Sequence, residues 1–263
     1  MINFNQSFDL GYNETQDALS IRIEAHKRFS NFSLEDWLDE RFPVKSGNII
    51  LDIGCGSGNF FPLYSKKIGD HGAIVGIDQS CNLLSEAMKC ECNTPRILLK
   101  WNMNNRFPFM DNSFDYIISS FAIYYVNETE PIIKEIKRLL KPKGEVFLIG
   151  PTDRNARELY EYNKMVFGFD EDERIDKRTN RLEHEFYPGM ETIFGNSNIE
   201  KIPSKLIFPN KTEFIRYYMA TLLYEESIKK ACLKPDAKEL FSVKMLSYEI
   251  SKEMIMLQSK KNE

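Results

Sequence analysis

The residues best suited to chemistry lie between positions 48 and 59, where the sequence is NIILDIGCGSGN. A short apolar run ends in Asp52, and three glycines follow at alternate positions, Gly54, Gly56 and Gly58. A strand that enters a glycine-rich turn and then an amphipathic helix is how α/β domains bring backbone against a nucleotide. Because glycine lacks a Cβ and tolerates positive φ, such a turn can pass closely beneath a ligand. The stretch therefore predicts a nucleotide-binding turn.

The spacing of the glycines indicates which nucleotide is bound. A dinucleotide fingerprint, G-x-G-x-x-G, would require a glycine at position 59, where the chain has Asn59. The pattern present, D-x-G-x-G-x-G, resembles that of the class I, Rossmann-like S-adenosylmethionine (SAM) dependent methyltransferases. The resemblance implies that the turn, including Cys55, lies beneath the methionine part and ribose of SAM, with Asp52 near its ammonium group.

A second acidic residue, Asp78, ends the next apolar run, and Gln79 follows it. A carboxylate at the end of the neighbouring strand can accept two hydrogen bonds from a ribose diol, and dinucleotide enzymes use an acid in the same way. The alternative role of Asp78 is to cap the following helix. By the resemblance, we expect Asp78 and Gln79 to contact the ribose side of the cofactor.

The third candidate segment is Asn102-Met103. Related methyltransferases commonly carry an acid at the first position, which contacts the adenine amino group, and a small or apolar residue after it. Asn102 departs from this pattern, but its amide oxygen can still accept a hydrogen bond from an amine. The preceding Trp101 is predicted to belong to the core rather than to stack on adenine.

The segment 107–126 resembles the "P-F-x-D-x-S-F-D" region and the strand exit that follows it in small-molecule methyltransferases. The resemblance, which covers residues 46 to 151, implies that Ser119 and Ser120 face the amino-acid end of SAM. It also implies that Tyr124 and Tyr125 border the acceptor pocket.

Four further residues outside this core are candidates. Arg22 and His26 are spaced i, i+4 and share one face of a predicted helix. The resemblance implies that this helix closes over SAM, with the arginine near the cofactor carboxylate, and an exposed helix pair is the alternative. His184 is a candidate pocket base. Tyr218 lies in an aromatic stripe that fits either an apolar lid over the acceptor or ordinary core packing.

Strands and helices alternate through the first half of the chain, which predicts a parallel sheet covered on both faces. Helices are expected at 15–30, from 33, and at 59–67, 80–89 and 130–140; strands are expected at 49–53, 73–77, 96–101, 114–119 and 145–149. Beyond Pro151 we expect helical segments in 153–195, a strand at 199–208, helices at 212–227 and 238–252, and a last strand at 254–258.

The predicted fold class is therefore α/β, with a Rossmann-like, mostly parallel seven-stranded sheet flanked by helices and carrying helical lid insertions. Residues 1–46 are expected to form an N-terminal helical cap and residues 47–151 the SAM-binding core. Residues 152–263 would supply the insertions and the C-terminal strands that complete the same domain.

Composition narrows the range of partners. The net charge of −4 among 263 residues offers no electrostatic reason to expect nucleic acid. Five scattered cysteines indicate free thiols in a reducing cytoplasm, and Cys90-x-Cys92 lacks the spacing of a zinc site. The N-terminus lacks the order of a signal peptide, and no apolar run approaches the roughly 20 residues of a membrane span. We expect a cytoplasmic protein with no metal and no membrane partner.

The functional prediction is methyl transfer from SAM to a nucleophilic N, O or C atom of a small molecule by in-line displacement, leaving S-adenosylhomocysteine. The alternatives are a methyltransferase that acts on RNA or protein and a SAM-binding protein without turnover. The acceptor, the methylated atom, the need for a general base and the oligomeric state stay open.

Overall fold

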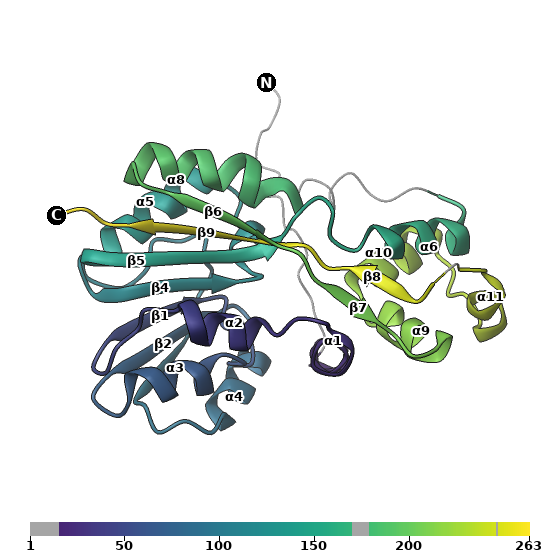
Figure 1. Cartoon of the computed structure of the whole chain (residues 1–263), viewed down its shortest axis with the longest axis horizontal. Coiled ribbons are helices and arrows are strands. Elements are labelled where there is room, and N and C mark those ends of the chain that lie inside the picture. The colour runs from purple at the N-terminus through teal and green to yellow at the C-terminus, as the bar shows by residue number, and fades with distance from the viewer. Residues whose placement is uncertain (1–15, 170–178, 246) are drawn as a thin grey trace.

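The computed structural model describes residues 16–169, 179–245 and 247–263 (Figure 1). A seven-stranded sheet has the order β3-β2-β1-β4-β5-β9-β6, in which β9 runs antiparallel to both of its neighbours. The other strand pairs in it are parallel. The strands are β1 Ile49–Ile53, β2 Ala73–Asp78, β3 Arg96–Lys100, β4 Phe114–Ser120, β5 Leu140–Pro151, β6 Asn198–Ile202 and β9 Met254–Lys260. The predicted fold class is confirmed.

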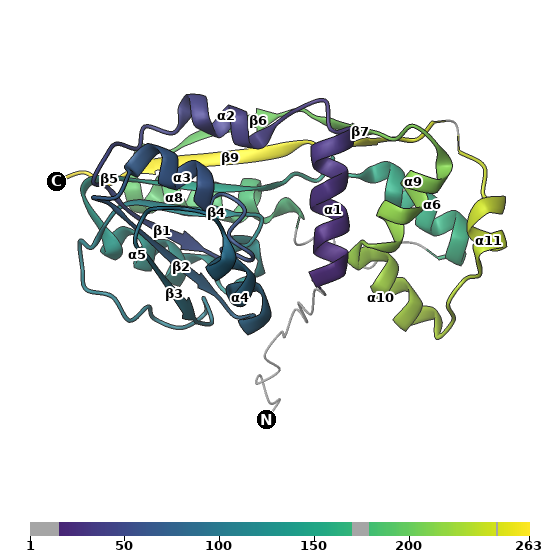
Figure 2. The ribbon, with the colours of Figure 1, turned by 90° about the horizontal axis from the view of Figure 1, so that it is seen from below.

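Helices cover both faces of this sheet (Figures 1 and 2). One apolar core lies between the sheet and α2 (Leu34–Arg41), α3 (Phe61–Ile68) and α4 (Cys81–Lys89). A second core lies on the opposite face, under α5 (Thr129–Leu139) and α8 (Tyr187–Phe194). Because both faces are buried, the central strands read as continuous apolar runs.

A smaller lobe lies beyond the carboxyl ends of the parallel strands (Figure 1). It combines α6 (Arg157–Phe167) with α9 (Lys211–Met219), α10 (Leu222–Ala231) and α11 (Ala237–Ser242). A two-stranded sheet of β7 (Lys205–Ile207) and β8 (Glu249–Ser251) completes it. The lobe has an apolar core of its own, to which both insertions contribute.

Helix α1 (Gln16–Phe29) lies between the sheet and the smaller lobe (Figure 2). It packs against α9 and β7, and its Ala25 joins the core of the lobe. A 3-10 turn, η1 (Ile123–Tyr125), follows β4, and a π-helical segment, η2 (Leu182–Phe186), precedes α8. The N-terminal helix is therefore positioned at the edge of the sheet where the glycine turn emerges.

The sequence correctly predicts the elements from α1 to β4 to within one or two residues. Capping explains this precision, since Ser33 accepts a hydrogen bond from Asp36 N (3.1 Å) at α2 and Ser80 accepts one from Leu83 N (3.3 Å) at α4. Strand β5 is longer than predicted, because it starts at Leu140, directly after α5.

Three predictions after residue 198 are wrong. The single strand 199–208 is two strands in different sheets, and Pro203, which has no N–H for a ladder, stands between them. The helix 212–227 is two helices, because Thr221 starts a new one by accepting a hydrogen bond from Tyr224 N (3.3 Å). The helix 238–252 ends at Ser242, and β8 occupies 249–251 because it pairs with β7.

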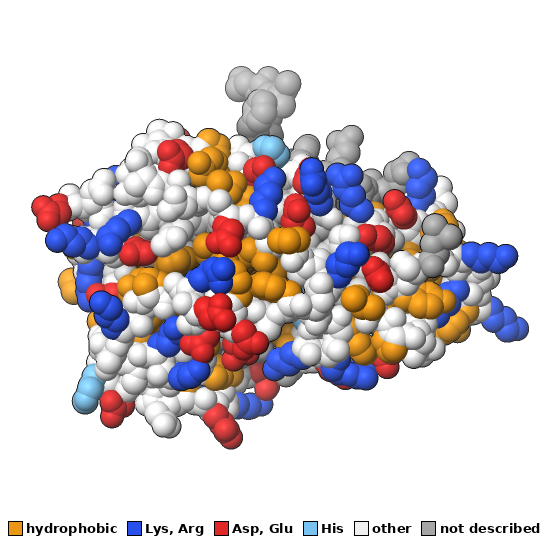
Figure 3. Space-filling model, in the orientation of Figure 1, with side chains coloured by type: hydrophobic (Ala, Val, Ile, Leu, Met, Phe, Trp, Pro, Cys, Tyr) orange, Lys and Arg blue, Asp and Glu red, His pale blue; other side chains and the backbone are white. Residues whose placement is uncertain are grey.

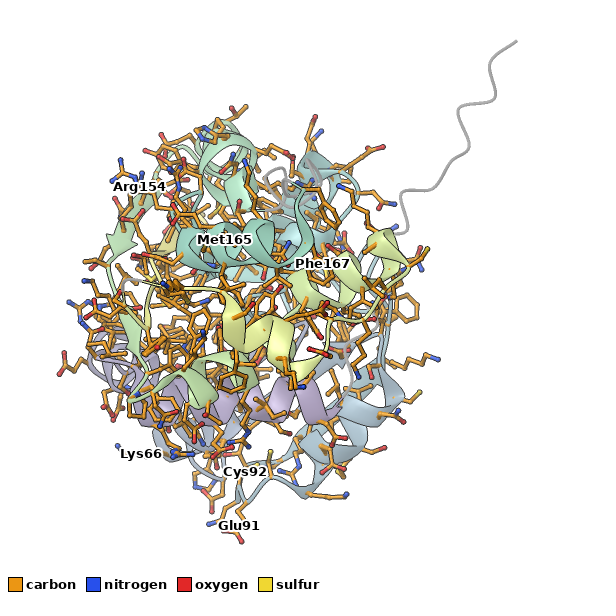
Figure 4. The ribbon with its side chains drawn as sticks, turned by 90° about the vertical axis from the view of Figure 1, so that its right-hand side faces the viewer. Lys66, Glu91, Cys92, Arg154, Met165 and Phe167 are labelled. Carbon is orange, nitrogen blue, oxygen red and sulfur yellow. The ribbon has the colours of Figure 1, made fainter. Side chains whose placement is uncertain are left out.

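The aromatic stripe of α6 is divided between core and surface. Tyr162 is fully buried, whereas Met165 is 52% exposed. Seen from the outer end of the lobe, Met165 lies on the side facing the viewer (Figure 4), while Phe167 packs against Tyr224 with ring centroids 6.0 Å apart. The stripe therefore contributes both to the lobe core and to the exposed surface of the lobe.

Candidate functional site

The glycine turn is bonded to the end of β2. The N–H groups of Gly54 and Cys55 both donate to the carbonyl of Ile77, at 2.8 and 3.0 Å. The next turn amide, Gly56 N, donates to Asp78 Oδ2 (3.0 Å). The other carboxylate oxygen of Asp78 accepts from Ser80 N at the start of α4 (2.8 Å). Asp78 thus orients both the turn and a helix N-terminus, and each of its oxygens keeps a further lone pair for a ligand.

Two other strand exits reach the same turn. A Cβ built on Gly54 would lie 2.2 Å from the Cβ of Ala122, which follows β4, and 3.7 Å from the Cε of Met103, which follows β3. The segments that the sequence singled out therefore converge at one edge of the sheet. The contact with Ala122 was missed by sequence reasoning, and the only signal for it is the small side chain itself.

Open space lies above Gly56. Its φ is +54°, and a Cβ placed there would meet no atom within 4 Å. Gly58 differs, because a Cβ there would lie 2.8 Å from the ring of Phe61. The requirement for glycine at position 58 is therefore internal packing, while at position 56 the turn leaves room for a ligand that approaches the backbone.

Two acidic side chains flank the turn: Asp52 lies in β1, which leads into it, and Asp78 at the end of β2 accepts the Gly56 N–H. Asp52 is 3% exposed. Burial raises its pKa to about 7, the charge of Asp78 acts in the same direction, and the Tyr64 hydroxyl opposes them. Burial also raises the pKa of Asp78, against the backbone N–H groups that favour its ionised form. Among the described residues no cationic side chain is found to act on either carboxyl group, which favours a positively charged ligand.

The two serines predicted at the carboxyl end of β4 differ in their hydrogen bonding. Ser119 Oγ donates to the carbonyl of Ile53 (2.7 Å), so it ties β4 to β1 and is fully buried. Ser120 Oγ is buried and has no hydrogen-bond partner among the residues that the structure describes. Buried polar groups are normally satisfied, so the Ser120 hydroxyl is the one that a ligand could use, while the Ser119 hydroxyl is already occupied.

The predicted adenine segment is partly occupied by its own contacts. Asn102 Oδ1 accepts from Asn104 N (2.9 Å) and Asn104 Nδ2 (3.0 Å). Its amide nitrogen remains a donor. Trp101 packs against the hydrophobic core, as predicted. Gln79 is exposed beside the turn.

His26 is not part of an exposed helix pair, so that alternative is wrong. Its ring makes an edge contact with Tyr217, with centroids 6.2 Å apart. Burial lowers its pKa to about 3, with smaller contributions from the charges of Lys252 and Arg22. His26 is therefore neutral at physiological pH, and Arg22 is the residue of this helix face that could meet an anionic group.

The acceptor candidates separate into two groups. Tyr124 is 7% exposed, Tyr125 is half-buried, and their ring centroids lie 4.7 Å apart after β4. Tyr218 is fully buried in the lobe core, and its hydroxyl donates to Asn163 Oδ1 (2.6 Å). His184 is exposed on η2. Tyr218 and His184 are therefore corrected to a core residue and a surface residue.

An open groove of about 550 Å³ lies elsewhere, along the start of α5. Its walls include three glutamates and Lys134, which already pairs with Glu130 (2.5 Å). The groove does not include the glycine turn, and we do not assign it to the cofactor. Among the described residues no cluster of three His, Cys, Asp or Glu side chains could hold a metal ion, and no helix has the length and apolar composition to cross a bilayer.

Comparisons with known proteins agree with this geometry. The family profile described as "Methyltransferase domain" matches residues 51–148. A second profile, described as protein-L-isoaspartate(D-aspartate) O-methyltransferase, matches residues 6–95. A demethylmenaquinone methyltransferase from Staphylococcus haemolyticus is 30% identical over 149 residues, which are 57% of this chain and 60% of that protein. The chain thus spans about three-fifths of this curated relative.

Solved structures share the fold. A Bacillus halodurans chain described as a methyltransferase superimposes with a TM-score of 0.61 at 14% identity, covering 88% of this chain and all of that one. A phosphoethanolamine N-methyltransferase 2 from Haemonchus contortus, solved with SAM, has a TM-score of 0.57 at 18% identity. That match covers 95% of this chain and 58% of the other.

Proposed function

Since this chain belongs to the class I, Rossmann-like SAM-dependent methyltransferases, we propose that it transfers a methyl group from SAM to a nucleophilic N, O or C atom of a small molecule. The observation that carries the proposal is the open space above Gly56, next to two acidic side chains on which no cation among the described residues acts. SAM, when bound, would supply a methyl group on a cationic sulfonium, from which an attacking nucleophile takes the methyl carbon while the neutral thioether leaves.

The residues of the turn fit such a cofactor. The backbone at Gly56 would pass beneath it, and Asp78 would accept hydrogen bonds from its ribose while holding the turn. The negative charge of Asp52 and Asp78 favours a cationic ligand. Ser120 offers an unused hydroxyl, and Arg22 offers a cation for a carboxylate. Asn102 and Met103 are proposed to border the adenine.

The protein's contribution to the reaction would be to align donor and acceptor and to exclude water. Tyr124 and Tyr125 are the remaining acceptor-side candidates, because they follow β4 directly. The half-buried Tyr125 is the one whose ring can meet a substrate. Neither residue is assigned as a general base, since an amine or an activated carbon needs little help while a phenol benefits from one.

The small-molecule acceptor is supported by the curated relatives, which are named for demethylmenaquinone. This compound is the first acceptor to test. The alternative of a protein substrate is favoured by the isoaspartate profile, but its match ends at residue 95 and covers β1 and β2 without the β4 exit. It therefore says nothing about the acceptor side.

An RNA substrate has less support. The net charge is −4, and on the face in Figure 3 cationic and anionic side chains are interspersed without a continuous basic surface. Nucleic-acid binding depends strongly on such a surface. A cytoplasmic location stays part of the proposal.

The test is incubation with methyl-labelled SAM and, in separate reactions, demethylmenaquinone, a small-metabolite extract, total RNA or total protein. We expect label in a small molecule. Label only in RNA or protein would contradict the acceptor class. SAM binding without label in any fraction would support a binding protein without turnover.

A further inference from the structure

A buried arginine from the second half of the chain holds the segment that follows β4. Arg181 directly precedes η2 and is 8% exposed. Its Nη1 donates to the carbonyl of Tyr124 (2.8 Å) and to that of Val126, and its Nη2 donates to the carbonyl of Asn127 (3.4 Å). One side chain thus bonds three carbonyls in η1 and in the two residues directly after it.

The charge of Arg181 is balanced by a residue of η2. Glu185 Oε2 accepts from Arg181 Nε (3.0 Å) and pairs with its Nη2 (2.9 Å). A guanidinium has five N–H donors in a fixed plane, so it can bond several carbonyls and a carboxylate at once. The three donors of a lysine share one nitrogen, and a lysine therefore cannot reproduce this set of contacts.

The turn is also enclosed by the end of β5. A Cβ built on Gly150 would lie 3.0 Å from the ring of Tyr124 and 2.5 Å from Cδ1 of Leu182, the residue after Arg181. Tyr124 and Leu182 also belong to the same apolar core. The turn η1 is therefore fixed both through its backbone carbonyls and through one of its side chains.

This turn begins at the proposed cofactor site. Ala122, which precedes η1, is the residue whose Cβ would collide with one built on Gly54, and its carbonyl accepts from Tyr125 N (3.0 Å). The half-buried ring of Tyr125 is thus carried on a turn that starts at the glycine turn and is held by Arg181. A displacement of η1 would move this ring relative to the cofactor.

We propose that Arg181 is a positioning residue for the acceptor: it fixes η1 so that the ring of Tyr125 is held against the acceptor during methyl transfer. The inference rests on the proposed function and deepens it, because it gives the segment between β5 and β6 a part in the acceptor side of the site. The hydrogen bonds of Arg181 described above go to η1, to the residues after it and to Glu185. Its loss should therefore impair methyl transfer more than SAM binding.

The test compares the wild type with Arg181→Met and Arg181→Lys. Labelling of a serially diluted small-metabolite extract with methyl-labelled SAM gives the maximal rate and the dilution that supports half of it, and calorimetry gives the SAM dissociation constant. For folded Arg181→Met we expect a maximal rate about 10- to 100-fold lower and a SAM dissociation constant changed by less than about twofold, since a displacement of about 1 Å at the acceptor affects the reaction and not cofactor binding. Arg181→Lys should retain an intermediate rate.

The matched control is Arg138→Met. Arg138 is also a largely buried arginine that bonds a backbone carbonyl, that of Phe109 (2.8 Å), but it holds the segment before β4. Its loss should lower the stability of the fold without separating the maximal rate of the folded protein from its SAM affinity.

Amide hydrogen exchange gives a readout that needs no acceptor. The N–H groups of Tyr125 and Val126 close η1 by donating to the carbonyls of Ala122 (3.0 Å) and Ile123 (3.2 Å). In Arg181→Met these two amides should exchange at least about tenfold faster than in the wild type, because local opening of η1 becomes easier. The amides of β4 should exchange at wild-type rates.

An unchanged maximal rate in folded Arg181→Met, or a loss of SAM affinity as large as the loss of rate, would overturn the proposal. Unchanged exchange at Tyr125 and Val126 would do the same, because Arg181 would then not act through η1. If Arg181→Met does not fold, Arg181→Lys decides by the same measurements. Absence of labelling by the wild type would instead contradict the proposed function, and the exchange rates would still test whether Arg181 holds the turn.

Discussion

At Gly54 a side chain would collide with Ala122, and at Gly58 it would collide with Phe61. Gly56 is the member of the pattern that faces open space. Glycine is thus needed for internal packing at two positions of the motif, whereas at the third it leaves space that a ligand can occupy. A substitution at Gly54 or Gly58 tests the stability of the fold, and only a substitution at Gly56 tests the cofactor site.

The tyrosines that looked equivalent in the sequence also differ in role. Tyr218 bonds to Asn163 inside the lobe core, so Tyr218→Phe leaves the Asn163 oxygen without this donor. We expect a loss of about 1–3 kcal/mol in the free energy of unfolding. Methyl transfer by the folded protein should be unchanged, because the hydroxyl does not line the proposed site. A large fall in kcat with unaltered stability, measured by urea unfolding and turnover, would restore Tyr218 as an acceptor residue.

Among the elements, the segment before β4 is held by two side chains of α5, Arg138 and Glu135. Arg138 donates to the carbonyl of Phe109 (2.8 Å) and pairs with Asp111 and Glu135, each at 2.6 Å. Glu135 in turn accepts from Phe107 N (2.8 Å). The "P-F-x-D" segment is therefore fixed against a helix by these contacts.

Arg138→Met should destabilise the fold by about 2–4 kcal/mol, because it leaves the largely buried Glu135 without its cation. Lys134→Met is the control on the same helix, since its pair with Glu130 is exposed on both sides and should contribute less than about 1 kcal/mol. Chemical denaturation of the two variants measures the free energy of unfolding that each one loses. Similar losses for both would show that the Arg138 network is not structural.

Helix α1 is coupled to acid stability through His26. Its folded pKa is about 3, below the ordinary value near 6.5, so the unfolded chain binds a proton at a higher pH than the folded chain does. Stability from neutral His26 is therefore present above pH 6.5 and is lost as the pH falls towards 3. His26→Gln should weaken this loss by a few kcal/mol.

The measurement is the free energy of unfolding of wild type and His26→Gln between pH 7 and 4. His71→Gln is the control, because the His71 side chain is 83% exposed and should change nothing. Parallel curves for wild type and His26→Gln would contradict the buried, neutral imidazole.

At the scale of the whole molecule, local signals explain what the sequence predicted. Strands β1 and β2 are short buried runs bounded by turns, and serine caps start α2 and α4. These signals lie in residues next to the ends of the elements, so the sequence predicted the element boundaries correctly. The parallel sheet explains why Gly54 and Met103 converge, because the carboxyl ends of parallel strands share one edge, whereas the contact of Gly54 with Ala122 was not predicted.

The second half depends on contacts between residues far apart in the chain. Strand β8 exists because it pairs with β7, and the helical periodicity of its sequence gave the opposite prediction. The lobe core draws α6 from one insertion and α9 to α11 from the other. The aromatic side chains of the two insertions therefore pack against each other. Sequence spacing alone could not distinguish this packing from a lid over the acceptor.

The central claim is that the space above Gly56 holds SAM. The most direct test is the calorimetric dissociation constant of SAM for the wild type, Gly56→Ala and the control Gly47→Ala. Gly47 also has a positive φ, +84°, with no atom within 4 Å of a built Cβ, so both variants carry the same kind of backbone strain of about 1–2 kcal/mol. We predict SAM binding by the wild type and Gly47→Ala, at least about tenfold weaker binding by Gly56→Ala, and no binding of NAD. Equal SAM affinity for folded Gly56→Ala and Gly47→Ala, or tight binding of NAD without SAM, would contradict the account.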